Sequence, residues 1–233
     1  MSTEAREAKK ALRNDIKARL SHLPEEEVTR QSTTAQNLIL SLPQYHEAKT
    51  LSIYLSMPLS EVRTDLLVRD ALGKGKRVFV PYIHSVPPPP KETHVGNTRD
   101  EYEGLGRDGW GIPHLSAAGI EERENGMGGV GTSLGTDGKY GGGGESGGGL
   151  DLIVLPGVAF DSAMSRMGHG AGFYDSYLTR FCADGKRRRP FLVGLCLAEQ
   201  ILPPGEIMMQ EWDWRVDAVA VGDGRLLTSS SVA

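Results

Sequence analysis

The stretch DLIVLPGVAFDSAMSRMGHGAGFYD, residues 151–175, decides the fold class. Its first five residues are almost all apolar, and such a run is typical of a strand covered on both faces, as in a parallel sheet. Pro156 and Gly157 end the strand, a loop follows, and a helical pattern runs from Tyr174 to Phe181. Parallel strands need helical connections of this kind, so the stretch predicts an α/β fold.

Similar apolar runs recur along the chain. Residues 50–55, 77–83, 191–195 and 216–221 are rich in Val, Ile and Leu, and residues 64–72 have a helical pattern. Strands that alternate with helices in this way favour a mostly parallel sheet with right-handed crossovers.

Two helices are predicted ahead of the first strand. Residues 4–20 place apolar side chains at steps of three and four, which forms one stripe that Lys9 and Arg13 flank. The second helix is expected to start near Pro24 and to end before Pro43, because proline suits a first helical turn and disfavours helix in the residue before it.

Composition excludes several classes of protein. The chain has 233 residues, a net charge of -4 and two cysteines, which argues against a nucleic-acid binder held by bulk charge and against a disulfide or Cys-rich zinc framework. No apolar run approaches the roughly 20 residues of a membrane helix, and residues 1–10 lack the apolar core of a signal peptide. We expect one domain over residues 1–233, a cytoplasmic location, a monomer, and neither nucleic-acid nor membrane partners.

Two segments interrupt the α/β pattern. Thirteen of the 24 residues over 126–149 are glycine, so we expect a flexible insert with too few side chains to pack. Residues 87–90 are all proline and predict an extended surface loop.

Gly168, Gly170 and Gly172 stand at alternate positions just before the helix in the opening stretch. Glycines there let backbone N–H groups approach a ligand, and the helix N-terminus favours phosphate. The alternative is a tight turn that merely needs positive φ. Arg166 upstream and Asp175 downstream favour the ligand interpretation, since they offer an anion clamp and a metal ligand.

A phosphate loop without its own lysine needs cations from elsewhere. Lys9 and Arg13, four residues apart, project from the same side of the first helix, although most such pairs are simply solvated. His169 is a candidate base or a solvated loop residue, and Trp110 is a candidate stacking platform or a plug for its loop. Asp213 is a candidate ligand for a cation, or it merely caps the start of the last strand.

Taken together, the chain resembles the 5-formyltetrahydrofolate cyclo-ligase family, whose members are also called 5,10-methenyltetrahydrofolate synthetases. The resemblance spans nearly the whole chain in the right order and leaves out the proline run and the glycine insert. It rests on seven motifs: AKKALR (8–13), SIYLSM (52–57), EVRT (61–64), WGIP (110–113), LPGVAFD (155–161), RMGHGAGFYD (166–175) and WRVDAV (214–219).

The resemblance implies a three-layer αβα fold with the N-terminal helix pair packed on the sheet. It also implies an ATP- and Mg²⁺-dependent closure of 5-formyltetrahydrofolate to 5,10-methenyltetrahydrofolate. The family's catalytic cations match Lys9, Arg13 and Arg166, and its Mg²⁺ carboxylates match Asp175 and Asp213. Its folate-binding positions match Leu55, Met57, Glu61 and Trp110. Its ATP-binding positions match Lys9, Lys10, Ala11, Leu12, Arg13, Arg166, Met167, Gly168, His169, Gly170, Ala171, Gly172, Phe173 and Tyr174.

Ala171 stands where the family often has a lysine. The residues by themselves are also compatible with two other functions. One is a nucleotide- or phosphate-binding protein without catalysis. The other is a sugar-phosphate isomerase or an acyl-CoA transferase, since the same broad fold hosts both.

Overall fold

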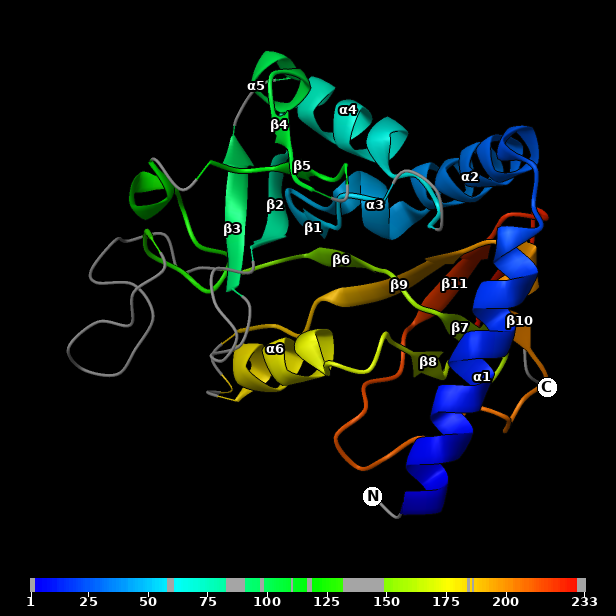
Figure 1. Cartoon of the computed structure of the whole chain (residues 1–233). Coiled ribbons are helices and arrows are strands. Elements are labelled where there is room, and N and C mark those ends of the chain that lie inside the picture. The colour runs from blue at the N-terminus through cyan, green and yellow to red at the C-terminus, as the bar shows by residue number, and fades with distance from the viewer. Residues whose placement is uncertain are drawn as a thin grey trace.

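A sheet in the order β12-β11-β9-β6-β1-β2-β3 forms the centre of the computed structural model (Figure 1). Its five inner strands are all parallel, and they are the five that the apolar runs predicted. Their bounds are β1 Thr50–Ile53, β2 Arg77–Tyr82, β6 Leu152–Leu155, β9 Phe191–Cys196 and β11 Ala218–Val221. The edge strands β3 (Lys91–Gly96) and β12 (Leu226–Thr228) are antiparallel to their neighbours. The structure describes residues 3–57, 61–82, 91–96, 99–109, 111–116, 119–131, 149–183, 185 and 187–229.

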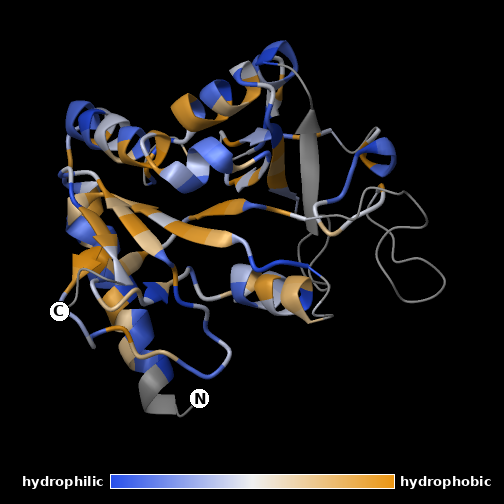
Figure 2. Ribbon diagram, turned by 180° about the vertical axis from the view of Figure 1, so that it is seen from behind, coloured by the Kyte–Doolittle hydropathy of each residue, from blue (hydrophilic) through white to orange (hydrophobic). Residues whose placement is uncertain are grey.

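Helices cover both faces of this sheet, which confirms the three-layer expectation (Figures 1 and 2). Alternate residues of β6 show the division. Leu152 and Val154 belong to the core under α2 and α4, whereas Ile153 and Leu155 belong to the core over α6. Burial on both faces is why the strand is apolar throughout. The helices are α1 Thr3–Ser21, α2 Glu25–Leu40, α3 Pro43–Glu47, α4 Asp65–Gly73, α5 Arg99–Glu103 and α6 Phe173–Cys182.

A second, small sheet in the order β10-β7-β8 corrects the expected position of the first helix. It consists of β10 (Ile201–Leu202), β7 (Ala159–Asp161) and β8 (Arg166–Met167). The predicted stripe of α1 buries Ile16 completely, but against Met167 and Leu202 of this sheet. Of the N-terminal pair, α2 packs on the large sheet, whereas α1 reaches the core of that sheet only through Leu20 near its end. The remaining short elements are β4 Gly106–Arg107, β5 Pro113–His114, η1 Ile120–Glu122 and η2 Ala198–Gln200.

The first residues of the predicted glycine insert form defined contacts. Glu124 and Val130 form an antiparallel bridge, and the buried Asn125 donates from Nδ2 to the Gly131 carbonyl at 2.9 Å. Arg187 also donates to the Met127 carbonyl at 2.7 Å. These contacts hold residues 126–131 against the rest of the fold, and the flexibility of the insert stays a prediction. Residues 132–148 and the run of four prolines lie outside the described residues.

The strand order creates a switch point between β1 and β6. The chain leaves β1 toward α4 on one face, and it leaves β6 toward α6 on the other. In open α/β sheets the carboxyl ends of two such strands form a crevice that takes ligands. The folate-binding candidates after β1 and the glycine loop before α6 therefore come from the two sides of this switch point.

Candidate active site

The glycine loop connects β8 to α6. Gly170 has φ +105°, and Gly172, the N-terminal cap of α6, has φ +68°. The tight-turn interpretation is thus correct for these two glycines, because side chains disfavour such angles. Gly168 has a different reason: an added Cβ would lie 3.1 Å from Arg166 Nη1. The loop is therefore shaped both by its turn and by close approach of an arginine.

Arg166 lies beneath the loop with its side chain 3% exposed. Its Nη2 donates to Asp175 Oδ2 at 2.7 Å, and its Nη1 donates to the Pro156 carbonyl at 3.4 Å. Its buried Nε has no hydrogen-bond partner among the described residues. An unpartnered buried N–H is costly, so this donor is suited to an oxygen of a ligand.

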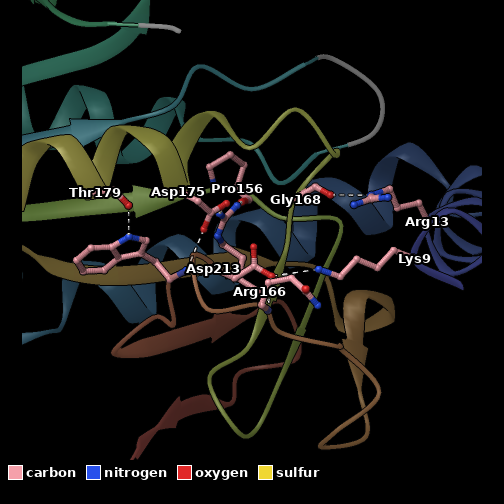
Figure 3. A network of polar contacts seen from close by, with 10 residues as sticks. Lys9, Arg13, Pro156, Arg166, Gly168, Asp175, Thr179 and Asp213 are labelled. Carbon is pink, nitrogen blue, oxygen red and sulfur yellow. Dashed lines mark hydrogen bonds and ion pairs between the residues drawn. The ribbon is translucent and has the colours of Figure 1, made fainter. Parts of the chain in front are cut away.

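Helix α1 supplies two more cations (Figure 3). Lys9 Nζ lies 3.1 Å from Asp213 Oδ2, and Arg13 Nε donates to the Gly168 carbonyl at 2.8 Å. The Arg13 guanidinium also covers Gly170, where an added Cβ would lie 3.5 Å from it. Burial lowers the pKa of Arg13, while the charge of Asp213 opposes that shift. Arg13 thus brings a cation onto the loop that lacks its own lysine.

These groups line a cavity of about 450 Å³. Of the predicted ATP-binding residues, those that contribute to it are Lys9, Arg13, Arg166, Met167, Gly168, Gly170 and Gly172. Lys10 and Ala11 are exposed and are not among its lining residues, and Leu12 packs toward the small sheet. His169, Ala171, Phe173 and Tyr174 are not lining residues either. The lining residues are Lys9, Arg13, Arg166, Met167, Gly168, Gly170, Gly172, Asp175, Ser176, Thr179, Arg180, Gln210, Trp212 and Asp213.

The two candidate metal ligands face the same cavity. Asp175 Oδ1 accepts from the Trp214 backbone N–H at 2.9 Å, and Asp213 Oδ2 accepts from that of Gln210, also at 2.9 Å. Each carboxylate also pairs with a cation, as described above. Within the described ranges no cluster of three or more His, Cys, Asp or Glu is suited to a metal. Two carboxylates are enough for Mg²⁺ when phosphate oxygens and water complete its shell.

The folate-binding candidates lie beside the glycine loop. Glu61 Oε2 accepts from the Met57 backbone N–H at 3.1 Å, and its Oε1 lies 3.4 Å from His169 Nε2. Leu55 and Met57 are half-buried. The structure therefore brings the segment after β1 into contact with the loop before α6. Trp110 lies outside the described residues.

Sequence reasoning missed five lining residues. Ser176, Thr179 and Arg180 share a face of α6 with Asp175, at steps of one, four and five residues. That helical spacing was a usable signal. Gln210 and Trp212 come from the irregular segment before β11, which carries no period.

Comparison with known proteins decides the family. A model of the 5-formyltetrahydrofolate cyclo-ligase family matches residues 5–130 and 142–222. The chain belongs to the 5-formyltetrahydrofolate cyclo-ligase family. The match passes over residues 131–141, inside the predicted glycine insert.

Relatives along nearly the whole chain agree with the family. A mouse 5-formyltetrahydrofolate cyclo-ligase is 34% identical over 93% of this chain and 94% of its own. A probable 5-formyltetrahydrofolate cyclo-ligase of Schizosaccharomyces pombe is 32% identical over 91% of this chain and 93% of its own. The expected enzyme class, a ligase of folate one-carbon metabolism, is confirmed. The family membership does not support the isomerase, transferase and non-catalytic alternatives.

Solved structures support the fold. The Aquifex aeolicus 5,10-methenyltetrahydrofolate synthetase superposes with a TM-score of 0.62 at 24% identity, over 95% of this chain and 92% of that one. The Mycoplasma pneumoniae 5,10-methenyltetrahydrofolate synthetase gives 0.58 at 18% identity, over 91% and 97%.

The cellular location stays a prediction. An Arabidopsis thaliana relative, 27% identical over 93% of this chain, is named a mitochondrial 5-formyltetrahydrofolate cyclo-ligase. In the part of the chain that the structure describes, no helix has both the length and the apolar character needed to cross a membrane.

Proposed function

We propose that this cyclo-ligase converts 5-formyltetrahydrofolate to 5,10-methenyltetrahydrofolate with MgATP, and that the ATP phosphates lie in the cavity between α1 and the glycine loop. The observation that carries this proposal is that Lys9, Arg13 and Arg166 line one cavity together with a loop whose glycines admit a ligand to the backbone. Three cations around a helix N-terminus are suited to a polyphosphate.

ATP is required because the formyl oxygen is a poor leaving group. Transfer of the γ-phosphoryl group to that oxygen breaks the bond to ADP and gives an imino-phosphate at N5. The N10 amine then attacks the formyl carbon and loses its proton, and phosphate leaves with the former formyl oxygen. Such transfer depends on positioning and charge neutralisation more than on a protein nucleophile, which agrees with the residues around the cavity.

Each group has a defined part in this proposal. Lys9 and Arg13 bind phosphate oxygens from the α1 side, and the free Nε of Arg166 donates from below. Asp175 and Asp213 are the carboxylates that would hold Mg²⁺, which neutralises charge on the phosphate oxygens when bound. Glu61 would accept from the N–H edge of the pterin, and its approach to His169 would bring the folate against the phosphate loop.

The proposal is tested with purified protein, 5-formyltetrahydrofolate and MgATP, by following the chromophore of the methenyl product. Lys9→Ala and Arg13→Ala should each raise the ATP requirement roughly tenfold or more, because a charge-assisted contact contributes about 1.5–3 kcal/mol. The KM for folate should change little. Lys10→Ala is the matched control, since Lys10 is an exposed neighbour on the same helix.

Unaltered ATP dependence in both the Lys9 and the Arg13 variants would exclude the cavity as the phosphate site. No turnover in the parent protein, with folate and MgATP both present, would exclude the reaction itself.

A further inference from the structure

A second cavity, of about 590 Å³, adjoins the phosphate cavity. The two share Thr179, Trp212 and Asp213 as lining residues. A ligand whose phosphates meet Lys9 can therefore extend past Asp213 into the second cavity. None of the folate-binding candidates in the described part of the chain lines either cavity, so this space lies away from the proposed folate side.

The two arginines that line the second cavity are already engaged. Arg189 Nη1 lies 2.9 and 2.8 Å from the two oxygens of Asp217, and Arg215 Nη1 donates to Ser165 Oγ at 2.8 Å. The indole N–H of Trp214 donates to Thr179 Oγ1 at 3.0 Å. Because these arginines are already paired, the second cavity is poorly suited to binding a polyphosphate.

Trp212 is different. The residue is 56% exposed, and it is one of three exposed large apolar residues in the described ranges. Its indole makes no hydrogen bond with any described residue. It immediately precedes Asp213, which pairs with Lys9 at 3.1 Å. A flat aromatic group that lines both cavities is thus open to solvent.

We propose that Trp212 is the stacking platform for the base of the nucleotide. The purine lies on the indole face in the second cavity, while the phosphates lie against Lys9, Arg13 and Arg166. This inference rests on the proposed function and deepens it, because it names the residue that binds the nucleoside half of the co-substrate. Stacking is tolerant of base identity, so ATP and GTP should depend on Trp212 alike.

The experiment separates base binding from phosphate binding. Base–aromatic stacking corresponds to about a 5- to 150-fold change in affinity on truncation to alanine. Trp212→Ala should therefore weaken MgATP binding by that factor, measured by calorimetry and as KM, while Trp212→Phe stays within about threefold of the parent. Binding of inorganic tripolyphosphate and the KM for folate should not change. Met208→Ala is the control, because Met208 is also exposed but lines neither cavity.

Three results would contradict the stacking role of Trp212 and leave the phosphate assignment intact. Equal loss of MgATP and tripolyphosphate would mean that Trp212 only supports the loop that carries Asp213. A raised KM for folate with normal ATP binding would place the pterin there instead. Unchanged MgATP binding in Trp212→Ala would exclude any contact. A parent protein that binds neither MgATP nor tripolyphosphate would overturn the phosphate assignment, and the platform with it.

Discussion

Asp175 and Asp213, the two candidate metal ligands, each form an ion pair with a cation of the protein, Arg166 and Lys9 respectively. Arg166 and its partner are the more buried pair, with side chains 3% and 16% exposed. Asp175 is not the cap of α6, since Gly172 occupies that position. Replacing Asp175 should therefore leave the buried Arg166 without its counter-charge and, if Asp175 binds Mg²⁺ as proposed, should also weaken metal binding.

We predict that Asp213→Asn raises the Mg²⁺ concentration needed for half-maximal turnover and changes the melting temperature little. Asp175→Asn should raise that concentration too. It should also lower the melting temperature, by roughly 2–4 °C for each kcal/mol of stability lost, because Arg166 then lacks its counter-charge. Asp217→Asn removes a carboxylate that lines neither cavity and serves as the control. A double variant of Asp175 and Asp213 with the parent's Mg²⁺ dependence would rule out the metal role.

Some residues of the site can be predicted from local sequence patterns, and others cannot. Arg166 and Asp175 were predictable because they flank a glycine pattern, and Lys9 and Arg13 because their helical spacing is regular. Trp212 and Gln210 were not, since an irregular segment gives no rule for where its side chains point. The tertiary contact between Glu61 and His169 joins segments 108 residues apart, which no local pattern encodes.

At the scale of elements, burial decides what is predictable. The five inner strands are apolar on both faces, so their runs are visible in the sequence. The edge strand Lys91–Gly96 reads KETHVG and has no such run. The strands of the small sheet have two or three residues, too few to show a period, which is why the partner of α1 was missed.

Asp151 links the starts of two inner strands, β1 and β6. Its Oδ2 accepts from the backbone N–H groups of Lys49 and Thr50 at 2.8 and 2.9 Å, and from Thr50 Oγ1 at 2.9 Å. Burial raises the pKa of Asp151, but these hydrogen bonds outweigh it, so its pKa lies below the ordinary value. A carboxyl with a lowered pKa stabilises the fold above its unfolded pKa of about 4, and that contribution is lost as the pH falls through the folded pKa.

We therefore predict that Asp151→Asn lowers the free energy of unfolding at pH 7 by about 1 kcal/mol, a value reduced for solvent screening. The difference from the parent should shrink as the pH falls below about 4. Urea unfolding at several pH values measures both effects. Asp100→Asn, an exposed carboxyl on α5, is the control, and a pH-independent difference would contradict the linkage.

At the scale of the whole molecule, the glycine insert has a start that forms defined contacts, and the family match passes over residues 131–141. We predict that replacing residues 132–148 by a short Gly-Ser linker leaves turnover unchanged and stability equal or up to about 1 kcal/mol higher, because a shorter loop costs less entropy to close. Asn125→Ala, at that start, should instead destabilise the protein by about 1–3 kcal/mol, since it removes a buried hydrogen-bonding group. A linker variant that folds but has no turnover would show that the insert is functional.

The ion pair between Lys9 and Asp213 joins positions 204 residues apart in the chain. A ribosome that adds 5–20 residues per second reaches Asp213 about 10–40 s after it has passed Lys9. During that interval the first helix carries its cations without the carboxylate that they will face, and the second wall of the phosphate cavity does not yet exist. If the phosphates of ATP bind as proposed, a chain whose synthesis has not yet reached Asp213 should not bind ATP.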